Sequence, residues 1–265
     1  MTNPAAMYED WFVPAVFAPL AREVIGRTDV PAGARVLDVA CGSGIVARTV
    51  APLVGPKGHV VGLDFNQAML ANARRAAEAE GLDIDWREGS AEDLPFGNGV
   101  LDLVFCQMGL QCFPDRLRAA AEMHRVLALG GQVIVTTWRG LDQNPFFAAF
   151  ERSVRRHFNS PAIELPFSMG DPIVVAELLQ DANFTNISVE PVEIEANYTQ
   201  PDRFIELQVV ASAAAIPALQ ALDATELGNI IAAIREEMVE PVREATTGDR
   251  LRFPMRGFVT RGVRK

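Results

Sequence analysis

The sequence has few of the residues that build covalent or metal-linked frameworks. Its 265 residues include only three cysteines and three histidines, and Cys41, Cys106 and Cys112 form no CxxC pair. This spacing is that of neither a disulfide framework nor a zinc site, and it suits a reducing cytoplasm. No cluster of histidine and carboxylate residues predicts a metal centre. We therefore expect a cytoplasmic protein that needs no metal.

An excess of positive charge and a long hydrophobic run are missing too. The 24 lysines and arginines stand against 34 acidic residues, for a net charge of −10. Proteins that displace counterions from nucleic acid usually carry the opposite sign. The apolar stretch 211–222 is interrupted by Pro217 and falls short of the roughly 20 residues of a membrane span. The start MTNPAAMYEDWF lacks the basic region of a signal peptide. We expect a small-molecule partner, no nucleic acid and no membrane span, and leave a homodimer open.

Strand-like and helix-like segments alternate along the first half of the chain. Short apolar or alternating runs predict strands at 35–40, 59–63, 82–87, 101–106 and 132–137. Helical patterns separate them at 45–53, 66–80 and 114–127. This alternation predicts parallel βαβ crossovers in a doubly wound α/β sheet. Such sheets bind ligands beyond the carboxyl ends of their strands.

The second half is less regular. It contains helical patterns at 144–158, 171–182, 201–215 and 225–246, and strand patterns at 187–198 and 252–263. The helical stretch between the last two strands is too long for a hairpin loop. We therefore expect it to form a lid over the site.

A glycine turn followed by an acidic residue marks the candidate ligand site. The segment VLDVACGSG ends a predicted strand and opens a helix, with Gly42 and Gly44 in the turn. Asp64 ends the next strand, twenty residues after Gly44, where a carboxylate can accept from both ribose hydroxyls of an adenosine. Gly42-x-Gly44-x-x-Ala47 also fits the dinucleotide fingerprint. On these features alone, a nicotinamide or flavin enzyme remains an alternative.

Four ordered stretches resolve this ambiguity. The sequence resembles the class I S-adenosylmethionine-dependent methyltransferases, in particular the branch of the ubiquinone and menaquinone C-methyltransferases. The matching stretches are VLDVACGSG (36–44), VVGLDFNQAML (60–70), GSAEDLPF (89–96) and HRVLALGGQVIVTTW (124–138). The resemblance implies a mostly parallel seven-stranded, Rossmann-like methyltransferase fold with helical cap and lid insertions. We accordingly expect one domain, comprising an N-terminal helical cap (1–30), a cofactor-binding core (31–140), further core elements with lid insertions (141–250) and a final strand (251–265).

The resemblance also implies roles for the matching residues around S-adenosylmethionine and its product S-adenosylhomocysteine. The methionine part would lie against Asp38, Gly42, Ser43, Gly44, Gln107 and Met108. Asp64 would bind the ribose, and Phe65 and Met69 would flank the adenine. The adenine edge would meet Ser90, Ala91 and Glu92. Tyr8 and Phe12 would close over the sulfonium. Three of these residues also have a purely structural alternative. Asp38 could bond the backbone of its own loop, Met69 could pack within its helix, and Glu92 could be a solvated charge.

No residue of the sequence stands out as a catalytic base. The weak candidates are His157, Trp138 and Tyr198, because each falls where a lid or a strand end would meet the acceptor. Phenylalanines at 146, 147, 150, 158 and 167 permit an apolar acceptor, although aromatic residues at helical spacing are more often core. The prediction is methyl transfer to oxygen, nitrogen or carbon of a small molecule. The alternatives are an NAD(P)-dependent oxidoreductase and a non-catalytic S-adenosylmethionine-binding protein.

Overall fold

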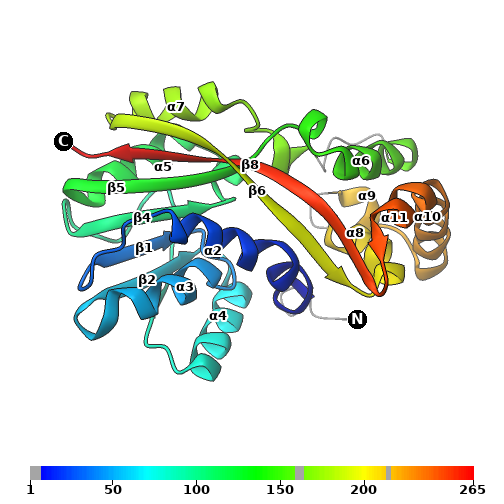
Figure 1. Ribbon diagram of the computed structural model, residues 1–265, viewed down its shortest axis with the longest axis horizontal. Helices are drawn as coiled ribbons and strands as arrows, with labels where there is room; N and C mark the ends of the chain where they lie inside the picture. The colour runs from blue at the N-terminus through cyan, green and yellow to red at the C-terminus, as the bar shows by residue number, and fades with distance from the viewer. Residues whose placement is uncertain (1–6, 159–163, 213–215) are drawn as a thin grey trace.

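A computed structural model describes residues 7–158, 164–212 and 216–265. Its centre is one sheet with the strand order β3-β2-β1-β4-β5-β8-β6 (Figure 1). The strands are β1 (Arg35–Val39), β2 (His59–Asp64), β3 (Asp85–Glu88), β4 (Leu101–Gln107), β5 (Leu127–Trp138), β6 (Thr185–Thr199) and β8 (Arg250–Val263). Neighbouring strands are parallel except at β8, which runs antiparallel to β5 and β6. The predicted α/β fold with a mostly parallel sheet is confirmed, and a short β7 (Thr246–Thr247) adds an eighth strand beside β8.

Helices cover both faces of this sheet (Figure 1). On one face lie α2 (Ala18–Gly26), α3 (Ile45–Val54) and α4 (Gln67–Glu80), and on the other α5 (Arg116–Val126) and α7 (Pro172–Asp181). Side chains along β4 alternate between two buried clusters, with Phe105 in one and Val104 and Cys106 in the other. This is the pattern of a strand that is buried on both faces. Short single turns are η2 (Gly55–Lys57), η3 (Leu110–Cys112), η4 (Leu141–Gln143), η5 (Leu165–Phe167) and η6 (Pro201–Arg203).

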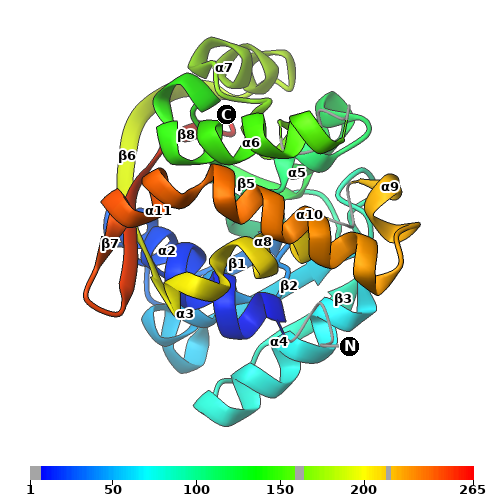
Figure 2. The same ribbon diagram turned by 90° about the vertical axis from the view of Figure 1, so that its right-hand side faces the viewer.

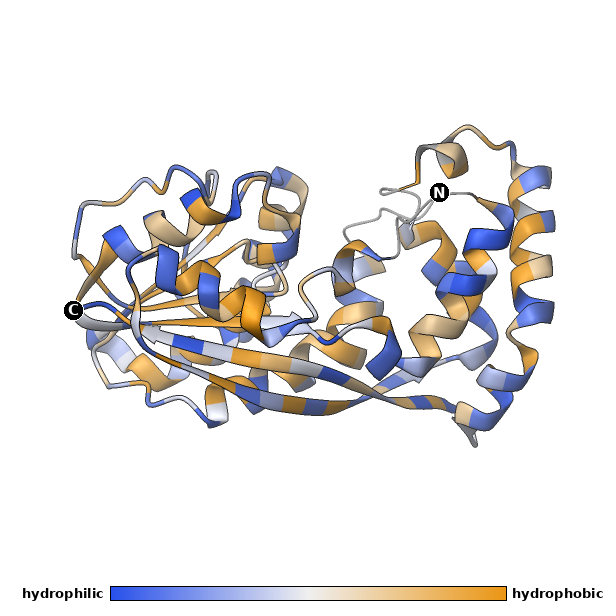
Figure 3. Cartoon of the chain, turned by 90° about the horizontal axis from the view of Figure 1, so that it is seen from above, coloured by the Kyte–Doolittle hydropathy of each residue, from blue (hydrophilic) through white to orange (hydrophobic). Residues whose placement is uncertain are grey.

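Strands β6 and β8 extend well beyond the rest of the sheet. The last residue of β5, Trp138, pairs with Gly257, so that residues 250–256 of β8 continue past the carboxyl end of β5. They remain paired with β6 as far as Thr199 and Arg250. Figure 3 shows this two-stranded arm running from the sheet to a separate group of helices. The arm therefore places the helical segment on the side where the parallel strands end.

The helices at the far end of the arm are α8 (Phe204–Ser212), α9 (Pro217–Gln220), α10 (Ala224–Glu237) and α11 (Val239–Ala245). They gather with α6 (Pro145–His157) in the end view of Figure 2. The single helix expected at 225–246 is wrong, because the chain ends α10 at Met238 and begins α11 in a new direction. The helix expected at 201–215 begins later, with α8, and its residues 213–215 lie outside the described part.

The N-terminal segment packs on the arm. Tyr8–Phe17 forms a widened π-helical segment, η1, which continues directly into α2. The Trp11 ring lies 5.3 Å from that of Tyr198 on β6, and Phe12 meets the same ring edge-on. The N-terminal segment and the arm thus meet above the carboxyl ends of β1 and β4.

Candidate active site

Asp64 is the best-defined polar group at the carboxyl ends of the strands. Its buried carboxylate accepts the Gly42 amide through Oδ2 and the Asn66 amide through Oδ1, each at 2.8 Å. Each carboxylate oxygen has two lone pairs, so both oxygens can accept one further donor. Asp64 therefore holds the glycine turn to β2 and retains the acceptor capacity that two ribose hydroxyls would need.

The two glycines of the turn serve different purposes. Gly42 has a φ of +56°, and a Cβ there would lie 3.9 Å from the Tyr8 ring, so its open side faces the N-terminal segment. At Gly44, also with positive φ, a Cβ would come within 2.2 Å of the Trp86 indole. A Cβ added at Gly62 on β2 would collide with the same indole. On this side Trp86 from β3 fills the space beside Gly44, and the contact of Gly44 with the methionine part stays a prediction.

Asp38 lies fully buried near the end of β1. Its Oδ2 accepts the Ala47 amide at 3.0 Å, which ties the strand to the first turn of α3. Burial, opposed by the Ala47 hydrogen bond and assisted by the charge of Asp64, raises the pKa of this carboxyl to about 8. The structure thus gives Asp38 the loop-bonding role that was the structural alternative, and its contact with the methionine part stays a prediction.

Two buried polar atoms beside the turn lack a partner. These are Ser43 Oγ and Gln107 Oε1, for which the described residues provide no hydrogen bond. The other end of the Gln107 amide donates to the Phe17 carbonyl at 3.2 Å. Unpaired buried polar atoms are uncommon and call for an explanation. Their positions at the glycine turn and at the end of β4 fit a polar ligand. Met108 comes directly after Gln107 in the chain and has a φ of +56°.

The predicted adenine side is open. Phe65, next to Asp64, is 78% exposed, which is unusual for a phenylalanine in a folded protein. Met69 is half-buried on the first turn of α4, where Asn66 caps the helix by accepting the amides of Ala68 and Met69. An apolar ring standing in solvent beside a buried carboxylate is what a stacking platform for a planar base requires.

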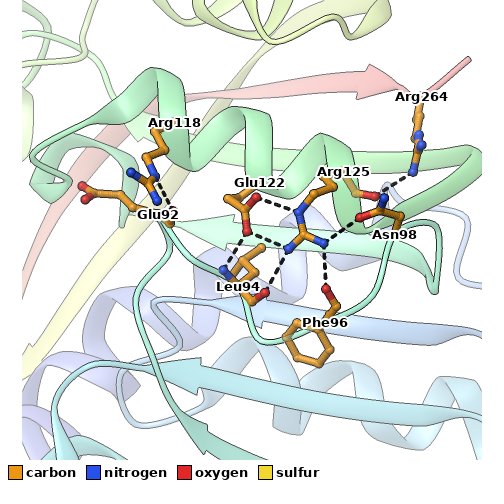
Figure 4. Close-up of polar contacts among 8 residues, drawn as sticks. All are labelled: Glu92, Leu94, Phe96, Asn98, Arg118, Glu122, Arg125 and Arg264. Atoms are coloured by element: carbon orange, nitrogen blue, oxygen red, sulfur yellow. Dashed lines mark hydrogen bonds and ion pairs between the residues drawn. The ribbon is translucent and has the colours of Figure 1, made fainter.

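The loop after β3 is arranged differently from the prediction. Ser90 is exposed and Ala91 is buried, while the Glu92 carboxylate accepts the Asp115 amide at 2.8 Å, just before α5. The Glu92 carbonyl accepts Arg118 Nε at 2.8 Å (Figure 4). Glu92 is therefore held against α5. Its proposed reading of an adenine amine stays a prediction, and so does the alternative of a solvated charge, because Glu92 is half-exposed.

Arg125 holds the rest of this loop (Figure 4). Its guanidinium donates to the carbonyls of Leu94 and Phe96 and to Asn98 Oδ1 at 2.7–2.9 Å. Glu122 pairs with Arg125 and also accepts the Leu94 amide at 2.8 Å. The HRVLALGG motif thus carries the arginine that fixes the loop at 89–96. Sequence reasoning used the motif but missed this function of the arginine.

A cavity of about 280 Å³ lies between the N-terminal segment, the arm, helices α6 and α8 and the turn η5. Its lining residues are mostly aromatic or aliphatic: Tyr8, Phe12, Val16, Phe17, Trp138, Phe147, Pro166, Phe167, Tyr198, Gln208, Ala211, Ser212 and Met255. None of these described lining residues is an aspartate, glutamate, histidine, lysine or arginine. Because Tyr8 also faces Gly42, the cavity begins where the glycine turn ends.

The three weak catalytic candidates separate in the structure. Trp138 and Tyr198 line the cavity, whereas His157 lies on α6 with Nε2 3.2 Å from Glu237 Oε1 on α10. Burial raises the pKa of the Tyr198 phenol, and burial together with the charge of Asp64 raises that of Tyr8. Both phenols are therefore neutral near pH 7 and unsuited to act as bases. His157 thus helps to join α6 to α10, and its catalytic role remains an untested prediction.

No helix among the described residues is both long and apolar enough to cross a membrane. Within the same ranges, no group of three or more histidine, cysteine or acidic side chains is arranged to hold a metal ion.

The segment that contains the glycine turn and Asp64 is similar to known proteins. Residues 36–131 match the family model described as a methyltransferase domain. The demethylmenaquinone methyltransferase of Geobacillus kaustophilus is 39% identical over 113 residues, which are 42% of this chain and 48% of that protein. The chain thus matches less than half the length of this curated relative.

Solved structures extend the likeness of fold to nearly the whole chain. The YcgJ protein of Bacillus subtilis superimposes with a TM-score of 0.61 at 17% identity, covering 92% of this chain and 97% of the other. A phosphoethanolamine N-methyltransferase of Haemonchus contortus, solved with S-adenosylhomocysteine, gives 0.58 at 17% identity over 98% of this chain and 56% of its own.

Residues 36–131 of this chain are therefore similar to a methyltransferase domain, and the fold is shared with a methyltransferase solved with S-adenosylhomocysteine. The particular resemblance to the menaquinone branch, expected from the four motifs, is confirmed by the identity within that core.

Proposed function

We propose that the chain binds S-adenosylmethionine at the carboxyl ends of β1, β2 and β4 and transfers its methyl group to a small, uncharged, apolar acceptor. The observation that carries the proposal is the placement of Tyr8 between the Gly42 turn and an aromatic cavity. The methyltransferase match over residues 36–131 and the fold of the structural neighbours support it.

The residues on the cofactor side suit the three parts of S-adenosylmethionine. Asp64 has an acceptor site left on each carboxylate oxygen for the ribose, and the exposed Phe65 ring is available to stack on the adenine. The unpaired Ser43 hydroxyl can donate to a carboxylate, and the unpaired Gln107 Oε1 can accept from an ammonium group. These are the two charged groups of the methionine part.

The cavity supports an uncharged acceptor. Burying a charge without a partner is costly, and the described lining offers no side chain of opposite charge. When bound, S-adenosylmethionine supplies an electrophilic methyl group on a sulfonium. The aromatic walls would exclude water and orient the acceptor, which is worth a large part of the barrier in well-aligned systems. Tyr8 and Tyr198 are neutral phenols, so neither would take up a proton that the acceptor has to lose.

Titration with S-adenosylhomocysteine tests the cofactor site. We expect wild-type protein to bind it and Asp64→Ala to weaken binding at least tenfold, because charge-assisted bonds to the ribose contribute about 1.5–3 kcal/mol each. Asp64→Asn, which keeps one acceptor oxygen, should fall between the two. Asp83→Ala removes an exposed carboxylate after α4 and serves as the matched control. Thermal unfolding of each variant would show whether the turn still folds.

NADH serves as the competing probe. Tight NADH binding without S-adenosylhomocysteine binding would favour the oxidoreductase alternative and refute the proposal. Binding of S-adenosylhomocysteine with no methyl transfer from S-adenosylmethionine to any of a broad panel of phenols, enols and amines would favour a non-catalytic binding protein.

A further inference from the structure

We infer that Gln208 on α8 selects acceptors that carry a hydrogen-bond donor, such as a hydroxyl group, on an apolar aromatic body. This inference rests on the proposed function and adds the polar group by which the cavity recognises its acceptor. Gln208 lines the cavity, and its side-chain Oε1 is shielded from solvent with no hydrogen-bond partner among the described residues.

The surroundings of Gln208 make this atom distinctive. The arm and β5 contribute Tyr198, Met255 and Trp138 to the cavity, and the N-terminal segment contributes Phe12 and Val16. None of these side chains has an amide or carboxylate. The neighbouring Ser212 donates its hydroxyl to the Gln208 backbone carbonyl at 2.8 Å, so it does not satisfy the side-chain oxygen.

A buried hydrogen-bond acceptor atom without a partner, here Gln208 Oε1, favours a ligand that donates a hydrogen bond to it. Sites built to hydrogen-bond a substrate hydroxyl reject analogues without one, because the polar group of the site is then left unpaired. An anionic acceptor would place a second negative group against the Oε1 dipole, in a lining without cations. The recognition chemistry thus specifies a neutral, flat and largely apolar acceptor with a donor at one edge.

The location of Gln208 gives this recognition a structural basis. Helix α8 belongs to the segment between β6 and β8, whereas the glycine turn and Asp64 belong to the sheet core. A change at Gln208 should therefore alter acceptor discrimination without altering cofactor affinity. A residue with a purely structural role would weaken both.

Three probes that share one ring system test the inference on the full chain. The probes are 2-naphthol, 2-methoxynaphthalene and 2-naphthoate, titrated by calorimetry with and without S-adenosylhomocysteine. We expect wild-type protein to prefer 2-naphthol over 2-methoxynaphthalene by roughly three- to tenfold, the range of one net hydrogen bond, and to bind 2-naphthoate weakest. Gln208→Leu should abolish the preference for 2-naphthol and leave the S-adenosylhomocysteine affinity unchanged.

Controls keep every result informative. Gln180→Leu, at an exposed position of α7, should retain the wild-type preference. Equal discrimination by Gln208→Leu and wild type, equal loss of both neutral probes, or no binding of 2-naphthol by wild type would each overturn the inference. Retained discrimination without S-adenosylhomocysteine binding would instead refute the proposed function while leaving the role of Gln208 standing.

Discussion

Replacing Arg48 with methionine should detach the N-terminal segment from the core. Arg48 Nη2 lies 2.7 Å from Glu9 Oε1 on η1, and Nη1 lies 2.5 Å from Glu80 Oε1 at the end of α4. The arginine side chain is only 6% exposed, against 23% for Glu9 and 46% for Glu80. Because Glu9 adjoins Tyr8, this buried ion cluster fixes the residue that stands between the glycine turn and the cavity.

The expected loss of stability in Arg48→Met follows from how exposed each of its two ion pairs is. The Glu80 pair is half-exposed and should contribute no more than about 1 kcal/mol. The Glu9 pair is a largely buried, charge-assisted contact, for which about 1.5–3 kcal/mol is typical. Methionine would keep part of the apolar packing of the arginine stem. We therefore expect Arg48→Met to lower the free energy of unfolding by about 2–4 kcal/mol.

Urea unfolding and ligand kinetics measure the two consequences. The control is Arg243→Met, whose pair with Glu240 is exposed on both sides and should change stability by less than about 1 kcal/mol. Arg48→Met should also release S-adenosylhomocysteine faster in a stopped-flow chase, because Tyr8 is no longer held over the turn. Equal destabilisation by the two variants, or an unchanged release rate in Arg48→Met, would refute the reasoning.

Two further predictions concern Asp38 and Arg125. The pKa of Asp38 is about 8 in the folded protein, raised by burial and by Asp64, and about 4 in an unfolded chain. The contribution of protonated Asp38 to the free energy of unfolding is therefore complete below pH 4 and is lost as pH rises towards 8. In urea unfolding, Asp38→Asn should accordingly gain stability relative to wild type between pH 4 and pH 8. Parallel curves would contradict this. Arg125→Lys loses the fork that binds the Leu94 and Phe96 carbonyls, and calorimetry should show S-adenosylhomocysteine affinity reduced roughly three- to tenfold. An affinity equal to that of wild type would show that the loop needs no such support.

Local patterns were enough to predict most of the sheet. Strand β2 and helices α3 and α4 lie within a residue of their expected bounds, because glycine and asparagine punctuate them: Asn66 caps α4, and Gly81 ends it with a φ of +69°. Helix termini of this kind depend on residues adjacent in sequence. The break between α10 and α11 at Met238 could not be predicted, because the whole 225–246 stretch is helical in composition. The chain changes direction where Met238 is buried among residues that are distant in sequence.

The site was only partly predictable for the same reason. Asp64 could be inferred because the position of an acid at a strand end is a local feature. The contacts of Trp86 with Gly44, Arg48 with Glu9 and Glu92 with the start of α5 join residues 23 to 42 positions apart, and no periodic pattern signals them. Gln208 was missed because one glutamine in an apolar helix is conspicuous only once its surroundings are known.

The two-stranded arm has a consequence for how such proteins could diversify. Apart from β7, the described residues between 200 and 249 lie outside the sheet, which the chain leaves after Thr199. Thr199 and Arg250 are direct partners in the β6–β8 register. A segment whose ends are adjacent can be exchanged as a cassette, because a tight turn or a different set of helices would leave every pairing of the main sheet in place. The acceptor-facing part of the molecule could then be replaced during evolution, or in the laboratory, while the machinery around Asp64 is inherited unchanged.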